Sequence, residues 1–407
     1  MKKKLYMMIA VLSMISFSYS QSWNIKIYNT SNSQIPSNDV RSLAIGRNSQ
    51  LWVGTTSGIG SLSNNIWTKL LVNTSILNVW TTGDSLWIGT ESKGLLRFSD
   101  NKLTNYDPYT IGFGILGFAI GKKDTIFRLD HIGSFNKWSG SSWTTIKMFI
   151  GHPEFLYSDS KKNIWVGSGN IGLFRYNSGT LFQFKNNIDT KANNYIPAYD
   201  LKCMVEDSDS NLWIGTGDKG LLKFNGNKWE IVPTPSNARV LDIDIDKSNR
   251  LWLATDKGIL RYFNGEWIIF NSSNSSLPND RVVSIKLENE NKIWAAVGYN
   301  DAYSPTGGKG IVCLTNELTG INSISKIDYR IYPNPTNNSI VVDFNNVFIK
   351  DMKVSITDLQ GKIFYSNCFQ NSISKLRIDI NDYPKGIYII NVRSESTLVN
   401  YKIMKVD

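Results

Sequence analysis

Histidine and cysteine are scarce in this chain, whose 407 residues contain only two of the first and three of the second. Zinc sites draw mainly on these two residue types, and Ser-His-Asp or Cys-His catalysis needs a well-placed histidine. We expect His131 to fill a degenerate repeat and His152 to be an ordinary exposed loop residue. Cys203, Cys313 and Cys368 are an odd count far apart in sequence, which does not suggest a disulfide framework. No phosphate-binding or dinucleotide-binding glycine motif occurs, so we expect no metal, no cofactor and no catalytic constellation.

Long apolar runs and blocks of one charge are also missing after residue 20. No apolar stretch there approaches the roughly 18 residues of a membrane helix, so no transmembrane span is expected. The net charge is +10, but outside Lys2–Lys4 the basic residues are spread along the chain. This distribution argues against nucleic-acid binding. The 41% hydrophobic and 19% charged residues exclude a disordered chain.

The N-terminus has the layout of a cleaved secretory signal. Lys2–Lys4 precede an apolar segment over residues 5–17, and small residues flank Tyr19. We expect cleavage between Ser20 and Gln21, which removes residues 1–20. The alternative, an N-terminal anchor helix, would need a longer apolar segment. The expected location is therefore secreted or on the outer cell surface.

A short pattern, aliphatic-Trp-aliphatic-Gly-Thr, recurs along most of the chain at intervals of about 40 residues. Most copies continue with a glycine, a short apolar run and a polar turn, and an apolar stretch precedes each copy. Each repeat therefore predicts four short strands, which at this period is typical of a β-propeller blade. The seven anchor residues are Trp52, Trp87, Phe127, Trp165, Trp213, Trp252 and Trp294, of which the third is the degenerate copy.

The two ends of the repeat region complete one another. Residues 23–39 repeat the pattern of residues 267–280, a Trp-led strand followed by a polar loop with Pro, Asn and Asp. The seventh repeat stops after its third strand at Leu314, so the N-terminal strand can supply the fourth. We expect an all-β, seven-bladed β-propeller over residues 21–316, closed by that strand. The alternative is an open β-solenoid.

Residues 317–328 are polar and are expected to form a linker to a second domain over residues 329–407. This region contains six or seven short alternating strands, which predict a small Ig-like β-sandwich. The alternative for it is a carbohydrate-binding sandwich.

The repeats over about residues 23–316 resemble the two-component-regulator propeller repeat. In that family the propeller is often a periplasmic glycan sensor that is joined through a membrane helix to a kinase. No such helix or kinase is found here, so the resemblance implies only the ligand-binding scaffold.

The C-terminal motifs resemble the type A sorting domain of type IX (Por) secretion. The resemblance implies that the secretion machinery carries the protein across the outer membrane of a Bacteroidetes-type bacterium. The domain is then removed, and the protein is released or attached to lipopolysaccharide. The matching residues are Tyr332, Pro333, Asn334, Pro335, Asp358, Gly361, Gly386, Tyr388, Lys402 and Lys405.

Three carboxylates alternate with apolar residues on the expected innermost strand of the sixth blade, at Asp242, Asp244 and Asp246. The period of a strand places them on one face, where they could line the central channel. There they could bind a cation or sugar hydroxyls, or act as paired carboxylates on a glycan. The alternative is that they are solvated or bonded locally. A second acidic run, Asp207–Asn211, is expected to be a turn rather than a calcium loop, because it lacks the required glycine.

Two long loops, over residues 186–200 and 297–309, contain side chains suited to sugars. Long loops on a rigid scaffold commonly carry binding sites, although such loops can also be free of ligand. The candidates are Tyr195, Tyr199, Tyr299, Asp301 and Tyr303.

The sequence thus favours a secreted or surface-displayed binding protein for an unknown glycan or protein ligand, without catalysis. One alternative is a glycan-degrading lyase or hydrolase that uses the carboxylates or tyrosines. The other is a non-catalytic surface adhesion protein.

Overall fold

The computed structural model describes residues 23–107, 114–185, 195–298, 307–316, 330–344, 352–358, 362–369, 373–393 and 398–406. It contains two compact units, one of residues 24–315 and one that holds the C-terminal residues from 316 onward. Both units are built from strands, and the helical segments described are three single turns, Arg47–Ser49, Lys122–Asp124 and Pro235–Asn237. Among the described residues, no helix is long and apolar enough to cross a membrane.

The described part of the first unit forms seven antiparallel sheets of four strands each, which we number by their order in the chain. Sheets 1 to 3 are β2 (Val40–Ile45), β3 (Leu51–Thr55), β4 (Gly58–Ser63), β5 (Ile66–Leu70); β6 (Ile76–Thr82), β7 (Ser85–Thr90), β8 (Leu95–Ser99), β9 (Lys102–Asn105); and β10 (Ile115–Ile120), β11 (Ile126–Asp130), β12 (Ser134–Trp138), β13 (Trp143–Met148). Sheets 4 to 6 are β14 (Pro153–Ser158), β15 (Ile164–Ser168), β16 (Gly172–Asn177), β17 (Thr180–Phe184); β18 (Leu201–Glu206), β19 (Leu212–Thr216), β20 (Leu221–Phe224), β21 (Trp229–Val232); and β22 (Val240–Ile245), β23 (Leu251–Thr255), β24 (Gly258–Phe263), β25 (Glu266–Phe270). Sheet 7 is β26 (Val282–Asn289), β27 (Lys292–Val297), β28 (Ile311–Thr315) and β1 (Asn24–Tyr28).

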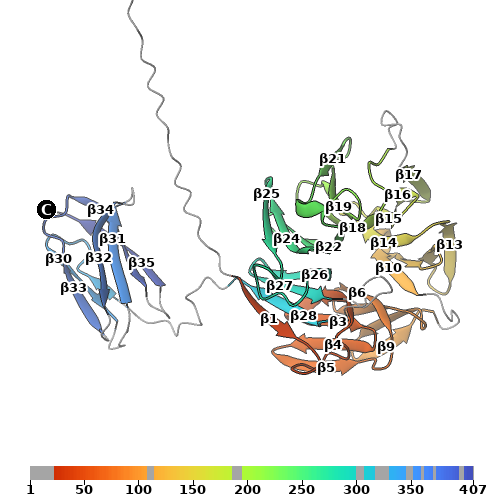
Figure 1. The fold of residues 1–407 in the computed structure, drawn as a ribbon, viewed down its shortest axis with the longest axis horizontal. Coiled ribbons are helices and arrows are strands. Elements are labelled where there is room, and N and C mark those ends of the chain that lie inside the picture. Colours follow the sequence, from red (N-terminus) through yellow and green to blue (C-terminus); the bar gives the residue numbers. More distant parts are fainter. Residues whose placement is uncertain are drawn as a thin grey trace, which may run out of the picture. The chain divides into compact units, whose positions relative to one another are not determined.

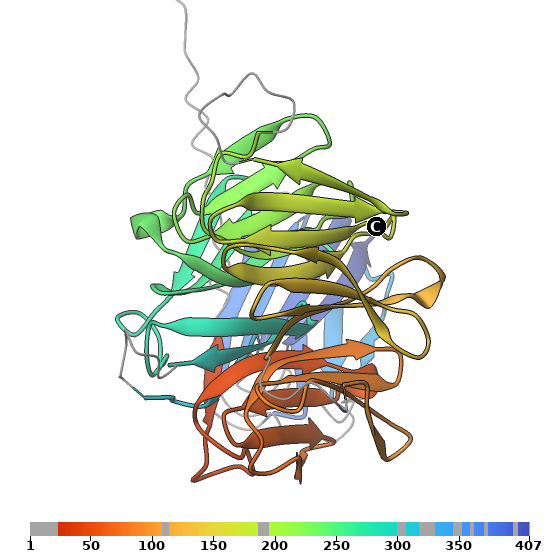
Figure 2. The same ribbon diagram turned by 90° about the vertical axis from the view of Figure 1, so that its right-hand side faces the viewer.

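The sheets follow one another around a common centre (Figure 1). The first strands of successive sheets contact each other, and β26 of the last sheet contacts β2 of the first. Strand β1 pairs with β28, with Asn24 opposite Thr315. The fourth strands, such as β13, β21 and β25, lie at the periphery. The view turned by 90° shows the same sheets side by side, from orange through green (Figure 2).

The recurring tryptophan lies on the second strand of a sheet, which is buried along its whole length in β3, β19 and β23. In some sheets an acidic residue lies six positions before the tryptophan, in the preceding turn, and accepts a hydrogen bond from the indole N–H. For example, Nε1 of Trp213 donates to Asp207 at 2.9 Å. The neighbouring third strand adds a cation over the ring, because the two residues are directly opposite in register. Four such pairs are Arg97 on Trp87, Arg175 on Trp165, Lys223 on Trp213 and Arg261 on Trp252, at 5.0–5.7 Å.

Sheet 3 differs because its anchor is Phe127. The next residue, Arg128, forms a buried ion pair with Asp107, and the two side chains keep only 7% and 0% of their accessible area. The guanidinium also lies 4.5 Å from the centre of the Trp143 ring. The degenerate repeat therefore has a charged contact to the preceding loop.

The first strand of each of the seven sheets contains the same irregularity. The pairing with the second strand shifts register between the first and third residues, which leaves the second residue outside the ladder. Such a bulge turns the extra side chain out of the regular alternation. The bulged residues are Arg41, Leu77, Leu116, Glu154, Lys202, Leu241 and Val283.

The C-terminal unit consists of two sheets that share one hydrophobic core, which includes Ile340, Val354 and Ile390. One sheet has the order β29 (Arg330–Tyr332), β30 (Ser339–Asp343), β33 (Lys375–Asp379). The other has the order β32 (Ile363–Phe369), β31 (Met352–Asp358), β34 (Gly386–Arg393), β35 (Leu398–Lys405).

Candidate functional site

The seven first strands enclose a channel. One cavity of about 310 Å³ is lined by residues from all of them, from Arg41 on β2 to Lys286 on β26. A second hollow of about 370 Å³ shares many of these residues and marks one end of the channel. We call this hollow the channel mouth. Its lining consists of Arg41, Leu77, Asn78, Leu116, Glu154, Lys202, Arg239, Leu241, Arg281 and Val283.

The lining of the channel mouth includes all seven bulged residues, one from each first strand. This coincidence explains how the mouth is built, because a bulge frees one side chain per strand without disturbing the rest of the ladder. Four of the seven are apolar and three are charged. The mouth therefore combines apolar surface with a few polar groups, as ligand pockets commonly do.

Ion pairs order the charged part of the mouth. Lys202 Nζ lies 2.7 Å from Glu154 Oε1 and 2.8 Å from Asp200 Oδ1, and Arg239 contacts the other oxygen of Asp200 at 3.2 Å. Burial alone would lower the pKa of Lys202, but the two carboxylates outweigh it and raise that pKa. Lys202 is thus a fixed ammonium group, held in one position by its partners.

Asp242 and Asp244 lie inside the channel, as their strand period suggested. Oδ2 of Asp242 accepts hydrogen bonds from the Ser284 hydroxyl at 2.9 Å, the Ile285 N–H at 3.0 Å and the Lys286 ammonium at 3.0 Å. Oδ2 of Asp244 accepts the N–H of Leu287 at 2.8 Å. Both carboxylates therefore fasten β22 to β26 of the next sheet.

The electrostatics of this group are coupled. Burial raises the pKa of Asp244, with Lys286 and backbone N–H groups acting in the opposite direction. Burial also disfavours the Lys286 ammonium, but Asp242 and Asp244 outweigh it and raise its pKa. An acid with a raised pKa beside a salt-bridged one is a pattern found in glycan hydrolysis. Here the donors of β26 bond Oδ2 of both carboxylates, and the N–H groups of Ile243 and Ile245 bond their Oδ1 atoms at 2.9 Å.

The third carboxylate of the run, Asp246, does not join this group. Its oxygens accept the side chain of Arg250 at 2.5 Å and the N–H of Ser248 at 2.9 Å, within the following turn. Asp207 behaves similarly, since its carboxylate accepts hydrogen bonds from Asn211 in the same turn and from Trp213 on the strand that follows. The described residues contain no group of three or more His, Cys, Asp or Glu that could hold a metal ion.

Two loop tyrosines, Tyr195 and Tyr199, lie among the described residues and are not part of the channel lining. Tyr195 forms an isolated bridge with Lys185, and Tyr199 is 52% exposed with its N–H on Asp218. Neither lines the channel or its mouth. The remaining loop candidates, Tyr299, Asp301 and Tyr303, lie outside the described residues.

Sequence reasoning missed the charged residues of the mouth, Arg41, Glu154, Lys202 and Arg239. The available signal was the residue at the second position of each first strand. In three of these strands that residue is charged, although it precedes the alternating residues of the strand. Reading the seven first strands in alignment places Arg41, Glu154 and Lys202 at that shared position.

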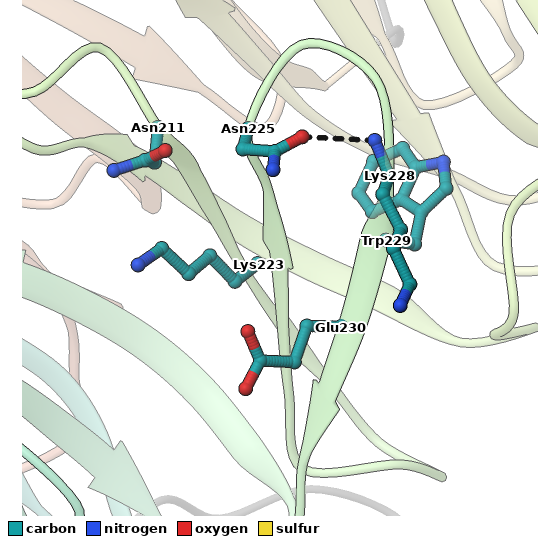
Figure 3. Close-up of a pocket in the computed structure, with 6 residues that line it drawn as sticks. All are labelled: Asn211, Lys223, Asn225, Lys228, Trp229 and Glu230. Atoms are coloured by element: carbon teal, nitrogen blue, oxygen red, sulfur yellow. Dashed lines mark hydrogen bonds between the residues drawn. The ribbon is translucent and has the colours of Figure 1, made fainter.

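Another hollow, of about 350 Å³, lies on sheet 5 (Figure 3). Lys223 and Glu230, directly opposite on β20 and β21, project from it, and Asn225 Oδ1 accepts the N–H of Lys228 in the hairpin at 2.9 Å. The aromatic floor is Trp229. All of its residues come from one sheet, so it lacks the convergence seen at the channel mouth.

The loop that follows β29 and contains Asn334 is hydrogen-bonded to the last strand, β35. Oδ1 of Asn334 accepts the N–H of Met404 at 2.9 Å, and its Nδ2 donates to the carbonyl of Lys402 at 3.0 Å. The peptide bonds that precede Pro333 and Pro335 are both cis. The nearly buried Lys405 donates to the carbonyl of Asn337.

Other predicted motif residues have local structural roles. The Tyr388 hydroxyl donates to the carbonyl of Pro384 at 2.7 Å, Tyr332 contacts Asp343, and Asp358 accepts the N–H of Lys362. Gly386 begins β34. Gly361, Ser20 and Gln21 lie outside the described residues.

Comparison with solved structures shows a β-propeller fold. PorZ, described as an essential bacterial surface component of the type-IX secretion system of Porphyromonas gingivalis, is 15% identical with a TM-score of 0.58, over 93% of this chain and 60% of PorZ. The extracellular domain of the putative one component system BT4673 from B. thetaiotaomicron is 15% identical with a TM-score of 0.52, over 90% and 56%. YCF48 from Cyanidioschyzon merolae is 13% identical with a TM-score of 0.52, over 72% and 98%. The chain therefore spans less than two thirds of the first two neighbours.

Two segments of the chain match known family models. Residues 330–406 match the secretion system C-terminal sorting domain, and residues 195–218 match the two component regulator propeller. Both resemblances drawn from the sequence are thus confirmed. No curated protein matches the chain. The sorting domain indicates export to the cell surface or secretion, and it implies interaction with type IX secretion machinery.

Proposed function

We propose that this protein is a secreted or surface-displayed binding protein that takes a glycan or protein ligand at the channel mouth. The observation that carries the proposal is the convergence of seven bulged residues, one from every first strand, on a single opening. A rigid ring that presents mixed polar and apolar side chains is a suitable binding surface. The residues we assign to ligand contact are Arg41, Glu154, Lys202 and Arg239.

The scaffold in this proposal is a seven-bladed β-propeller over residues 21–316, in which each sheet is one blade and β1 closes the ring. The contact between β26 and β2 and the pairing of β1 with β28 support it. A signal peptide over residues 1–20 precedes the propeller and is cleaved between Ser20 and Gln21. A linker over residues 317–328 leads to a small Ig-like β-sandwich over residues 329–407.

Export follows in two steps in this proposal. The signal peptide brings the chain to the periplasm, and the sorting domain then directs it through the type IX machinery. Removal of the sorting domain leaves the propeller released or attached to lipopolysaccharide. Truncation before residue 326 should trap the protein in the periplasm, as measured by fractionation and immunoblotting. Normal secretion of that truncated chain would contradict the assigned route.

Binding is tested by thermal shift and calorimetry of the full chain against oligosaccharides and peptides. A ligand at about 100 times its Kd adds roughly 2.7 kcal/mol, or a shift of several degrees. Lys202→Met should abolish that shift, whereas Lys69→Met, on the outer strand β5, should leave it unchanged. A shift that survives Lys202→Met, or the absence of any ligand in the panel, would argue against the mouth as the site.

A second candidate is a glycan-degrading lyase or hydrolase, which the raised pKa of Asp244 beside Asp242 favours. Incubation of each bound glycan with the full chain, followed by product analysis, separates this candidate from simple binding. Loss of turnover in Asp244→Asn with unchanged glycan binding would support it. The tyrosines at 195, 199, 299 and 303 and Asp301 remain proposed contacts for a larger ligand. Non-catalytic adhesion is the outcome if only whole cells, and no soluble ligand, bind.

A further inference from the structure

A second basic site lies between sheets 3 and 4, far along the strands from the channel mouth. Its hollow has a volume of about 280 Å³. The turn between β10 and β11 and the turn between β14 and β15 border it, at the opposite end of the first strands from the bulges. It is lined by Lys122, Thr125, Phe127, Lys137, Lys162, Ile164, Tyr176, Ser178 and Gly179. We call it the lysine groove.

The groove exists because the third repeat is degenerate. Its anchor is Phe127 instead of tryptophan, and the floor of the groove contains this ring with Tyr176 at 5.6 Å between ring centres. Lys137 is directly opposite Phe127 in the ladder, at the position where sheets 2, 4, 5 and 6 carry the cation that covers a tryptophan. In those four sheets the cation packs against an indole ring. In sheet 3 the smaller ring of Phe127 leaves room beside Lys137.

Sheet 3 also lacks an acid that three other sheets carry before the anchor. In sheets 4, 5 and 7 an acid six residues before the anchor accepts the indole N–H: Asp159, Asp207 and Glu288. In sheet 3 that position is Gly121, packed against Phe127. Asp159 itself is buried and is occupied by Asn163 and Trp165. Asp124 lies in the same β10–β11 turn, between Lys122 and Thr125, but is not part of the lining.

Three lysines, Lys122, Lys137 and Lys162, therefore line the hollow, and its lining contains no carboxylate. Lys122 Nζ is held by neutral groups, Asn177 Oδ1 at 3.0 Å and Ser178 Oγ at 3.4 Å, which orient the cation without neutralising it. Lys137 and Lys162 are exposed, and none of the ion pairs found among the described residues includes either of them. The hydroxyl-bearing Thr125 and Ser178 add further hydrogen-bonding groups.

From this arrangement we infer that the lysine groove binds a phosphate group, with room beside it for the small polar molecule that carries the phosphate. Lysines bind phosphate as compact point charges with rotatable donors. The partly exposed Tyr176 offers aromatic surface to the carrier. This site is separate from the channel mouth, since the two share no residue.

The test uses isothermal calorimetry on the full chain at low salt, with inorganic phosphate, glucose 6-phosphate and glucose as probes. We expect both phosphates to bind with one site, glucose not to bind, and affinity to fall as salt rises. Tighter binding of glucose 6-phosphate than of phosphate would identify a carried phosphate as the ligand. Equal affinity would identify the free anion. Absence of saturable binding by either phosphate would overturn the inference.

Variants locate the site. Lys137→Met retains the side-chain stem, and Lys162→Asn suits the positive φ of 62° at that position. Each should weaken phosphate binding about tenfold, which corresponds to one lost charged hydrogen bond. The matched control is Lys223→Met, at the position equivalent to Lys137 in sheet 5. Equal weakening by Lys137→Met and Lys223→Met would show that only net charge matters. No weakening by either groove variant would show that phosphate binds elsewhere, and either result would overturn the site.

Discussion

Replacing Asp242 with asparagine should destabilise the propeller, because this carboxylate joins two neighbouring sheets. Its Oδ2 accepts three donors from β26, including the Lys286 ammonium at 3.0 Å. Removing one partner of a buried ion pair costs about 3–5 kcal/mol. The channel leaves the Lys286 and Asp242 side chains 29% and 21% accessible, so we reduce the expected cost to roughly 2–3 kcal/mol. For a unit of this size that corresponds to a fall of about 4–6 °C in Tm.

Differential scanning calorimetry of the full chain measures this effect directly. The matched control is Asp209→Asn, an exposed turn residue, which should change Tm by no more than about 1 °C. The double variant Asp242→Asn with Lys286→Met should lose less than Asp242→Asn alone, because no ammonium group is left without its main partner. A Tm for Asp242→Asn equal to that of the control would refute the structural role. Those oxygens would then have to be considered free for a ligand.

Three further predictions concern other contacts. The pKa of Asp207 is lowered because hydrogen bonds from Trp213 and Asn211 outweigh burial, so Asp207→Asn should cost about 1 kcal/mol at pH 7. The wild-type advantage should be complete above about pH 5 and should decline as the pH falls below about 4 and through the lowered pKa of the folded protein. A Tm difference that stays the same from pH 7 down to about pH 2 would contradict this account. Arg128→Met should lower the free energy of unfolding by about 3–5 kcal/mol, because Asp107 stays buried without its cation. Adding Asp107→Asn should restore part of this loss. Chemical denaturation measures both variants, and a loss below about 1 kcal/mol for Arg128→Met would show that the ion pair is dispensable. Asn334→Ala removes two hydrogen bonds to β35 and should lower the stability of the sorting domain by about 1 kcal/mol. It should also lower the exported fraction, which cell fractionation measures. The control Asn367→Ala loses only a bond to its neighbour Cys368 and should be exported normally.

The repeated fold could be read from the sequence because each repeat carries its own tryptophan, glycines and turns. The spacing of Trp52, Trp213 and Trp294 predicted the second strands, and all three lie there. Even the Phe127 anchor, the weakest copy, lies on the second strand of its sheet. Local patterning is sufficient here because four-stranded sheets form mainly from neighbouring hairpins.

The channel mouth could not be read in the same way. Strand period put Asp242, Asp244 and Asp246 on one face, of which the first two line the channel and Asp246 does not. The period also says nothing about which donors of β26 reach the carboxylates. The bulges displace Arg41, Glu154 and Lys202 from that period altogether, so a regular strand would place them on the wrong side. Such residues can be found from the sequence only if the position of the bulge is already known.

A bulge repeated in all seven first strands has a consequence for how this protein can change over time. Because the side chain at that position is outside the ladder, its replacement does not shift the register or the buried tryptophan behind it. Each first strand therefore contributes one side chain to the mouth that can be replaced within the same ladder, although Glu154 and Lys202 are coupled by their ion pair. Relatives with the same scaffold can acquire different specificities through single substitutions at these positions, without an insertion and without a change in the core.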